Sequence, residues 1–148
     1  MDASINISFT IVGGVLTLLT VYGVLKLNRK LFLSGICFFS LLPMIGEGIS
    51  YCYKNSPIHA MVFFIFLTQF VLAFPNQIIF GHENEAANKL TTKIGLALIV
   101  INIGGGLYIF CLNAGVPMQF GYYHVVILLA LVYLMIKRNT GKGAAWVQ

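Results

Sequence analysis

The chain alternates long apolar segments with short connectors that carry most of its positive charge. A hydrocarbon core about 30 Å thick is crossed by roughly 20 helical residues at about 1.5 Å per residue. Several apolar segments here reach that length without a charged residue. Only 9% of the 148 residues are charged, too few to cover the surface of a soluble domain of this size. The sequence therefore predicts an integral membrane protein.

Five spans are expected, all helical, because backbone polar groups in lipid must bond within their own segment. Polar and turn-forming residues, such as Pro57, separate them. The expected spans are 5–25, 31–53, 59–80, 94–112 and 122–136, in one all-α transmembrane bundle over residues 1–148. The first segment lacks the features of a cleavable signal and is expected to be retained. Because the fifth span is the shortest, a four-span arrangement with an interfacial last helix stays open.

The positive charges predict the orientation of the bundle. With five spans, eight Lys and Arg residues fall on one side of the membrane and one falls on the other. The eight are Lys26, Arg29, Lys30, Lys89, Lys93, Lys137, Arg138 and Lys142, and the one is Lys54. Cytoplasmic connectors carry the excess, which predicts an outside N-terminus and a cytoplasmic C-terminus. This distribution of positive charge indicates orientation in the membrane and contact with anionic lipid headgroups, and it does not favour nucleic-acid binding. Without organelle-targeting features, a bacterial cytoplasmic membrane is expected.

Polar side chains within the spans are expected to face the bundle interior, where they bond across helices. Counted along the helices, Gln69 and Asn102 fall near the midplane and are expected to pair, and Asn76 lies nearer the inner face. Glu47 is the single acid inside a span, roughly 6 Å beneath the outer boundary. Ionisable residues at such depth are costly and often functional. These four residues form the predicted intramembrane polar path, although an ordinary hydrogen-bonded bundle would show the same ordering.

A second group of polar residues is expected at the outer level, beside Glu47. This predicted outer-face cluster consists of Tyr51, His59, Asn113 and His124. Glu47 is interpreted as a proton or cation site, or as a carboxylate that is hydrated or paired with a histidine. Two imidazoles and a carboxylate are ligand types for zinc. However, no tight motif such as HExxH is present, and neither a metal nor a cofactor is expected.

The cysteines and a run of glycines give two further structural predictions. The three cysteines are too scattered for a disulfide framework. Cys52 and Cys111 are expected near the same membrane face, so one bridge and a role as apolar fillers both stay open. Three consecutive glycines, Gly104–Gly106, favour a close helix crossing over a bend.

Three functions are compatible with these features. The first is a transport-related or pore-forming homo-oligomer whose polar path admits a small ion or another small ligand. The second is a non-catalytic accessory subunit or assembly factor of a larger membrane complex. The third is a membrane enzyme acting on a lipid or quinone-like substrate at the outer face. No Ser/His/Asp or Cys/His arrangement is readable and no catalytic residue is assigned, which favours a non-enzymatic role.

Overall fold

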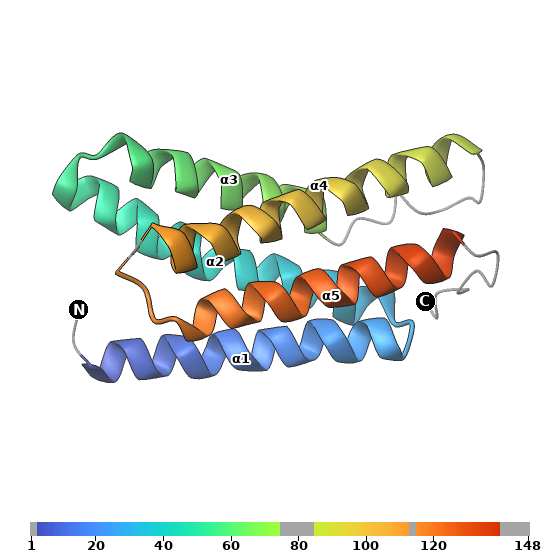
Figure 1. Ribbon diagram of the computed structural model, residues 1–148, viewed down its shortest axis with the longest axis horizontal. Coiled ribbons are helices and arrows are strands. Elements are labelled where there is room, and N and C mark those ends of the chain that lie inside the picture. Colours follow the sequence, from blue (N-terminus) through green and yellow to red (C-terminus); the bar gives the residue numbers. More distant parts are fainter. Residues whose placement is uncertain (1–2, 75–84, 113–114, 140–148) are drawn as a thin grey trace.

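The computed structural model describes residues 3–74, 85–112 and 115–139, and its regular elements are five helices. They are α1 (Ala3–Leu25), α2 (Arg29–Lys54), α3 (Pro57–Ala73), α4 (Glu85–Cys111) and α5 (Gln119–Asn139). Successive helices run in opposite directions and lie side by side along the long axis of the molecule (Figure 1). The prediction of an all-helical architecture is confirmed.

Four of the described helices are long and apolar enough to cross a membrane. Their apolar portions, 19 to 26 residues long, are Asn6–Leu25, Arg29–Lys54, Thr92–Cys111 and Gln119–Lys137. Helix α5, the shortest span expected from the sequence, is among them. Helix α3 is apolar but has 17 residues and ends at Ala73, whereas the expected third span continues to residue 80. Residues 75–80 of that span lie outside the described part of the chain.

The outer surface of the bundle is apolar on every helix. One large apolar side chain from each helix shows the pattern, since all five are more than half exposed: Leu18, Ile49, Met61, Val100 and Leu129. Soluble monomers rarely expose contiguous apolar surface on this scale. The helices therefore suit a lipid environment, in agreement with the membrane protein predicted from the sequence.

The five helices form a closed ring in chain order. Each helix packs against the helix that follows it in the sequence, and α5 closes the ring by packing against α1. Tyr123 of α5 contributes to this closure by donating a hydrogen bond to the carbonyl oxygen of Thr10 on α1 (3.0 Å). The α3–α4 contact is the smallest of the five helix–helix contacts. We call this loosest interface the α3–α4 seam.

Local sequence signals set the turns that join α1, α2 and α3. The side chain of Asn28 accepts a hydrogen bond from the Leu31 backbone N–H, which caps the start of α2. Asn55 ends α2 in a left-handed conformation (φ 46°), which asparagine tolerates better than most residues. Pro57 follows at the first turn of α3, where its missing N–H is not needed. The short α2–α3 turn therefore brings the end of α2 beside the beginning of α3.

Glycines allow α1 and α2 to approach closely. A Cβ at Gly23 would collide with the backbone of Phe32, and one at Gly35 would collide with Thr20. Small residues at such crossings let helix backbones meet, and packing of this kind is a main source of helix association in lipid. This close contact of α1 with α2 forms one wall of the ring.

Candidate functional site

Three polar side chains from three helices meet at the end of the bundle where α2 finishes. Nδ1 of His59 on α3 lies 2.6 Å from Oε2 of Glu47 on α2. The hydroxyl of Tyr108 on α4 donates a hydrogen bond to Oε1 of the same carboxylate (3.3 Å). Glu47 is 6% exposed, so its charge is largely removed from solvent. We call Glu47, His59 and Tyr108 the carboxylate cluster.

The α2–α3 turn explains why the first two members of the carboxylate cluster meet. Glu47 lies about two helical turns before the end of α2, and His59 lies in the first turn of α3. Because the turn between them is short, the two residues face each other from antiparallel helices. Tyr108 reaches Glu47 from the last turn of α4, so its hydrogen bond joins α4 to α2.

The carboxylate cluster has the chemistry of a proton-exchange or cation site. A carboxylate and an imidazole both gain and lose protons, and the imidazole ordinarily does so near neutral pH. When His59 is protonated, the pair is an ion pair between α3 and α2, and α2 is one of the helices long and apolar enough to cross a membrane. The phenol of Tyr108 orients the carboxylate without neutralising it, because it donates only a hydrogen bond.

A second polar network crosses the bundle deeper inside. Nδ1 of His124 on α5 lies 2.9 Å from Oδ1 of Asn102 on α4, and Nδ2 of Asn102 donates to Oε1 of Gln69 on α3 (3.1 Å). All three side chains are almost fully buried. Nε2 of Gln69 has no hydrogen-bond partner in the described part of the chain. We call Gln69, Asn102 and His124 the amide–imidazole network.

The ring of His124 occupies the centre of the helix ring. It makes an edge contact with Phe39 of α2 (ring centroids 5.2 Å apart) and a tilted contact with Phe66 of α3 (5.5 Å). On its third side lies Gly105 of α4, where a Cβ would come within 2.7 to 3.0 Å of the imidazole. The space left by Gly105 is therefore filled by an imidazole side chain, whereas the sequence analysis expected a close crossing of another helix at the three glycines. Nothing lies within 4 Å of a Cβ at Gly104.

The two sets of polar residues lie at different depths of the bundle. Tyr108 and Asn102 are six residues apart on α4, which corresponds to about 9 Å along the helix axis. The Glu47–Tyr108 bond and the Asn102–Gln69 bond both cross between α4 and the α2–α3 side of the bundle. Polar side chains thus join α4 to α2 at one level and α4 to α3, across the α3–α4 seam, at the other.

The buried hydroxyl groups of α1 and α2 do not extend these networks. The side chains of Thr17, Thr20 and Ser40 each donate to a carbonyl oxygen four residues earlier in their own helix. Bonds of this kind satisfy the hydroxyl locally. The polar side chains that link helices are therefore concentrated around α3 and α4.

The structure gathers some of the residues expected from the sequence and separates others. Gln69 and Asn102 are hydrogen-bonded, as their depths predict, and Glu47 and His59 lie together. His124 does not join His59 at the outer level, because it is bonded to Asn102 in the amide–imidazole network.

The remaining expected positions are not part of either set. Tyr51 is 42% exposed and makes no side-chain hydrogen bond to the three residues of the carboxylate cluster. Asn76 and Asn113 lie outside the described residues. Tyr108 was missed by the sequence analysis, although its spacing from Asn102 on one helix offers a weak signal of a shared interior face.

Cysteines and metal ligands add no further site in the part of the chain that is described. Cys37, Cys52 and Cys111 are free thiols, the first buried and the others exposed. No group of three or more His, Cys, Asp or Glu side chains lies close enough to hold a metal ion among these residues.

The chain matches no protein-family model, and comparisons with curated proteins and with solved structures find no match.

Proposed function

We propose that this protein has a transport-related role, and that it moves protons or another small cation along the polar side chains that join α4 to α2 and to α3. The observation that carries the proposal is the convergence of Glu47, His59 and Tyr108 inside the bundle, with a second polar network about 9 Å deeper. Polar side chains that link α4 to α2 and to α3 inside the bundle form a natural route, since ionisable residues in spans commonly mark ion and proton pathways.

The side chains at the centre of the helix ring limit the size of the species that this route can carry. Phe39, Phe66 and His124 occupy its centre, so no wide lumen runs between the described helices. A proton needs only hydrogen-bonded side chains and a few water molecules to move. A larger solute would need space between protomers, which is why a homo-oligomer belongs to this proposal. The route would pass Glu47, Asn102, Gln69 and then Asn76, which the sequence places nearest the inner face.

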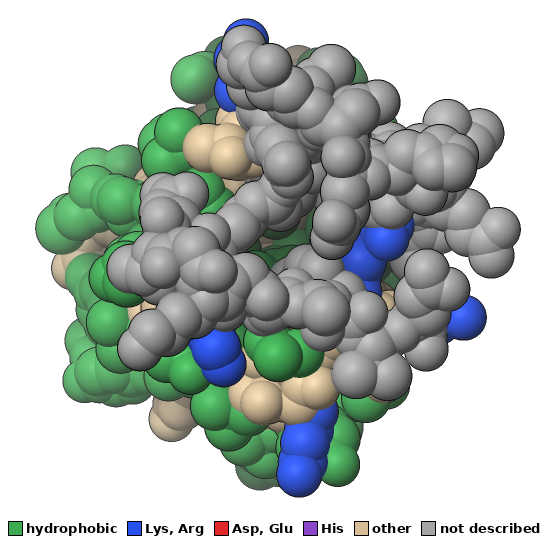
Figure 2. Space-filling model, turned by 90° about the vertical axis from the view of Figure 1, so that its right-hand side faces the viewer, with side chains coloured by type: hydrophobic (Ala, Val, Ile, Leu, Met, Phe, Trp, Pro, Cys, Tyr) green, Lys and Arg blue, Asp and Glu red, His purple; other side chains and the backbone are tan. Residues whose placement is uncertain are grey.

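The orientation proposed for the bundle follows from its basic end. Lys26, Lys30 and Lys137 lie at the end where α1 and α5 finish, and Figure 2 shows Lys and Arg side chains around that end. Lys54 lies at the opposite end, beside the carboxylate cluster. The positive-inside rule puts the basic end in the cytoplasm. Glu47 and His59 would then face the outer side of a bacterial cytoplasmic membrane.

A flux measurement tests this proposal. The purified protein is reconstituted into liposomes that contain a pH-sensitive dye, and a potassium gradient with valinomycin supplies the driving voltage. Proton entry well above that of protein-free liposomes is expected, with Na⁺ or K⁺ flux measured in parallel as the cation alternative. Fluxes equal to those of protein-free liposomes for all three ions would remove the transport role.

The buried networks also favour a second candidate, a non-catalytic subunit of a larger membrane complex. Side chains such as Asn102, bonded to both Gln69 and the Leu98 carbonyl oxygen, behave as ordinary bonds between helices. Extraction from native membranes in mild detergent distinguishes the two candidates. A stable hetero-complex together with absent flux supports the subunit role, whereas a homogeneous species without other proteins counts against it.

A further inference from the structure

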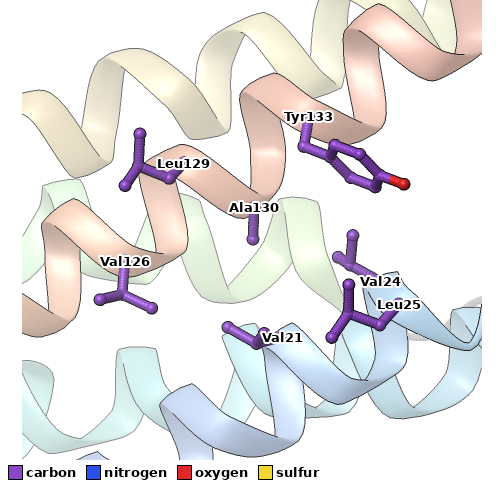
Figure 3. Close-up of a pocket in the computed structure, with 7 residues that line it drawn as sticks. All are labelled: Val21, Val24, Leu25, Val126, Leu129, Ala130 and Tyr133. Atoms are coloured by element: carbon purple, nitrogen blue, oxygen red, sulfur yellow. The ribbon is translucent and has the colours of Figure 1, made fainter.

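A shallow apolar groove lies on the outer surface between α1 and α5. Its volume is about 230 Å³, and Figure 3 shows side chains of both helices around it. The lining residues are Val21, Val24 and Leu25 of α1 with Val126, Leu129, Ala130 and Tyr133 of α5. The small side chain of Ala130 leaves the hollow, and the strongly exposed Leu25 and Leu129 form its ridges.

The groove ends at positive charges. Tyr133, at one end of it, has the ammonium group of Lys137 over its ring, 5.6 Å from the centroid. Leu25, the last residue of α1, is followed directly by the exposed Lys26. The apolar hollow therefore leads along the helix axes to two lysines, on the basic end shown in Figure 2.

We propose that this groove binds an acyl chain of an anionic phospholipid whose phosphate is held by Lys26 and Lys137. The apolar hollow matches a hydrocarbon chain, and the lysines match the negative headgroup at the depth where a headgroup lies. Basic pockets at the membrane surface of transmembrane bundles bind anionic lipids through the same combination. This site is separate from the carboxylate cluster, so the inference does not depend on the proposed transport role.

Charge complementarity favours a lipid over a second copy of the chain in this groove. Every copy inserts in the same orientation, so two copies that meet along α1 and α5 bring their basic ends together. Like charges held side by side oppose association, whereas an anionic headgroup neutralises them.

Lipid binding to the full-length protein in detergent provides the test. Dioleoyl phosphatidylglycerol and dioleoyl phosphatidylcholine, which differ in headgroup charge and share their acyl chains, are titrated separately and followed by native mass spectrometry. One phosphatidylglycerol is expected to bind in preference to phosphatidylcholine. Each of Lys26→Gln and Lys137→Gln is expected to weaken phosphatidylglycerol binding about fivefold, as one surface cation typically does. Lys54→Gln, at the opposite end, is the matched control and is expected to leave binding unchanged.

A second variant tests the groove itself. Ala130→Leu fills the hollow and is expected to weaken binding of both lipids. If it fails to fold, the headgroup preference and the lysine variants still decide the matter. Equal binding of the two lipids by the unmodified protein, or unchanged phosphatidylglycerol binding in both lysine variants, would overturn the proposal. So would a dimer that forms on delipidation and is lost in Ala130→Leu, because a second copy would then be the occupant.

Discussion

Replacing Glu47 with glutamine is expected to reduce proton flux in reconstituted liposomes by about 100-fold or more, the usual effect of removing a proton-transfer group. Glutamine has nearly the same shape and keeps an oxygen that accepts the Tyr108 hydroxyl hydrogen bond. It cannot exchange a proton or pair with a charged His59. The measurement is dye-reported flux at matched protein content, with thermal unfolding used to show that Glu47→Gln remains folded.

Tyr51→Phe is the matched control for this prediction. Tyr51 lies one turn from Glu47 on α2 and is exposed, so loss of its hydroxyl is expected to leave flux unchanged. If Glu47→Gln is unstable, Tyr108→Phe gives an independent test, because it removes only a hydrogen bond to the carboxylate. Normal flux in a folded Glu47→Gln protein would show that the carboxylate is structural.

Alanine substitutions at Gly104 and Gly105 are expected to change stability in opposite directions. A Cβ at Gly105 would overlap the His124 ring, which is held between Phe39 and Phe66 and has little room to move. Overpacking of this kind lowers the free energy of unfolding by about 1–3 kcal/mol. A Cβ at Gly104 meets nothing, so alanine there is expected to add about 0.5–1 kcal/mol by favouring the helix.

The measurement is unfolding of both variants in the same detergent, followed by circular dichroism. The two glycines are adjacent on α4 and receive the same substitution, so differences in expression or helix propensity cancel. Equal stabilities for Gly104→Ala and Gly105→Ala would mean that the His124 ring does not pack against α4. The central position assigned to this imidazole would then be wrong.

Apolar length and turn chemistry made the helices predictable from the sequence. The α2–α3 turn also made the proximity of Glu47 and His59 predictable, since both lie near the ends of helices joined by a few residues. Helix ends were less certain. The fifth helix starts at Gln119, earlier than the expected residue 122, because Gln119 and Gly121 interrupt the apolar run that was used to find spans.

Rotation of each helix about its axis could not be predicted from one sequence. Counted from a start at residue 122, His124 falls at the membrane surface, but it lies in the second turn of α5 and points to Asn102. Tyrosine is a residue type that is common at membrane interfaces, and only the packing of α4 turns Tyr108 towards Glu47. Such directions depend on contacts between helices, which hydropathy along one helix does not report.

The central claim is that Glu47 exchanges a proton inside the bundle, and infrared spectroscopy tests it most directly. The chain has four Asp and Glu residues, so the carboxyl C=O stretch of one of them is resolvable in spectra of the reconstituted protein. Acidification of the bath is expected to produce a carboxyl band that shifts in D₂O and is absent in Glu47→Gln. Identical pH-difference spectra for the two proteins would contradict the claim.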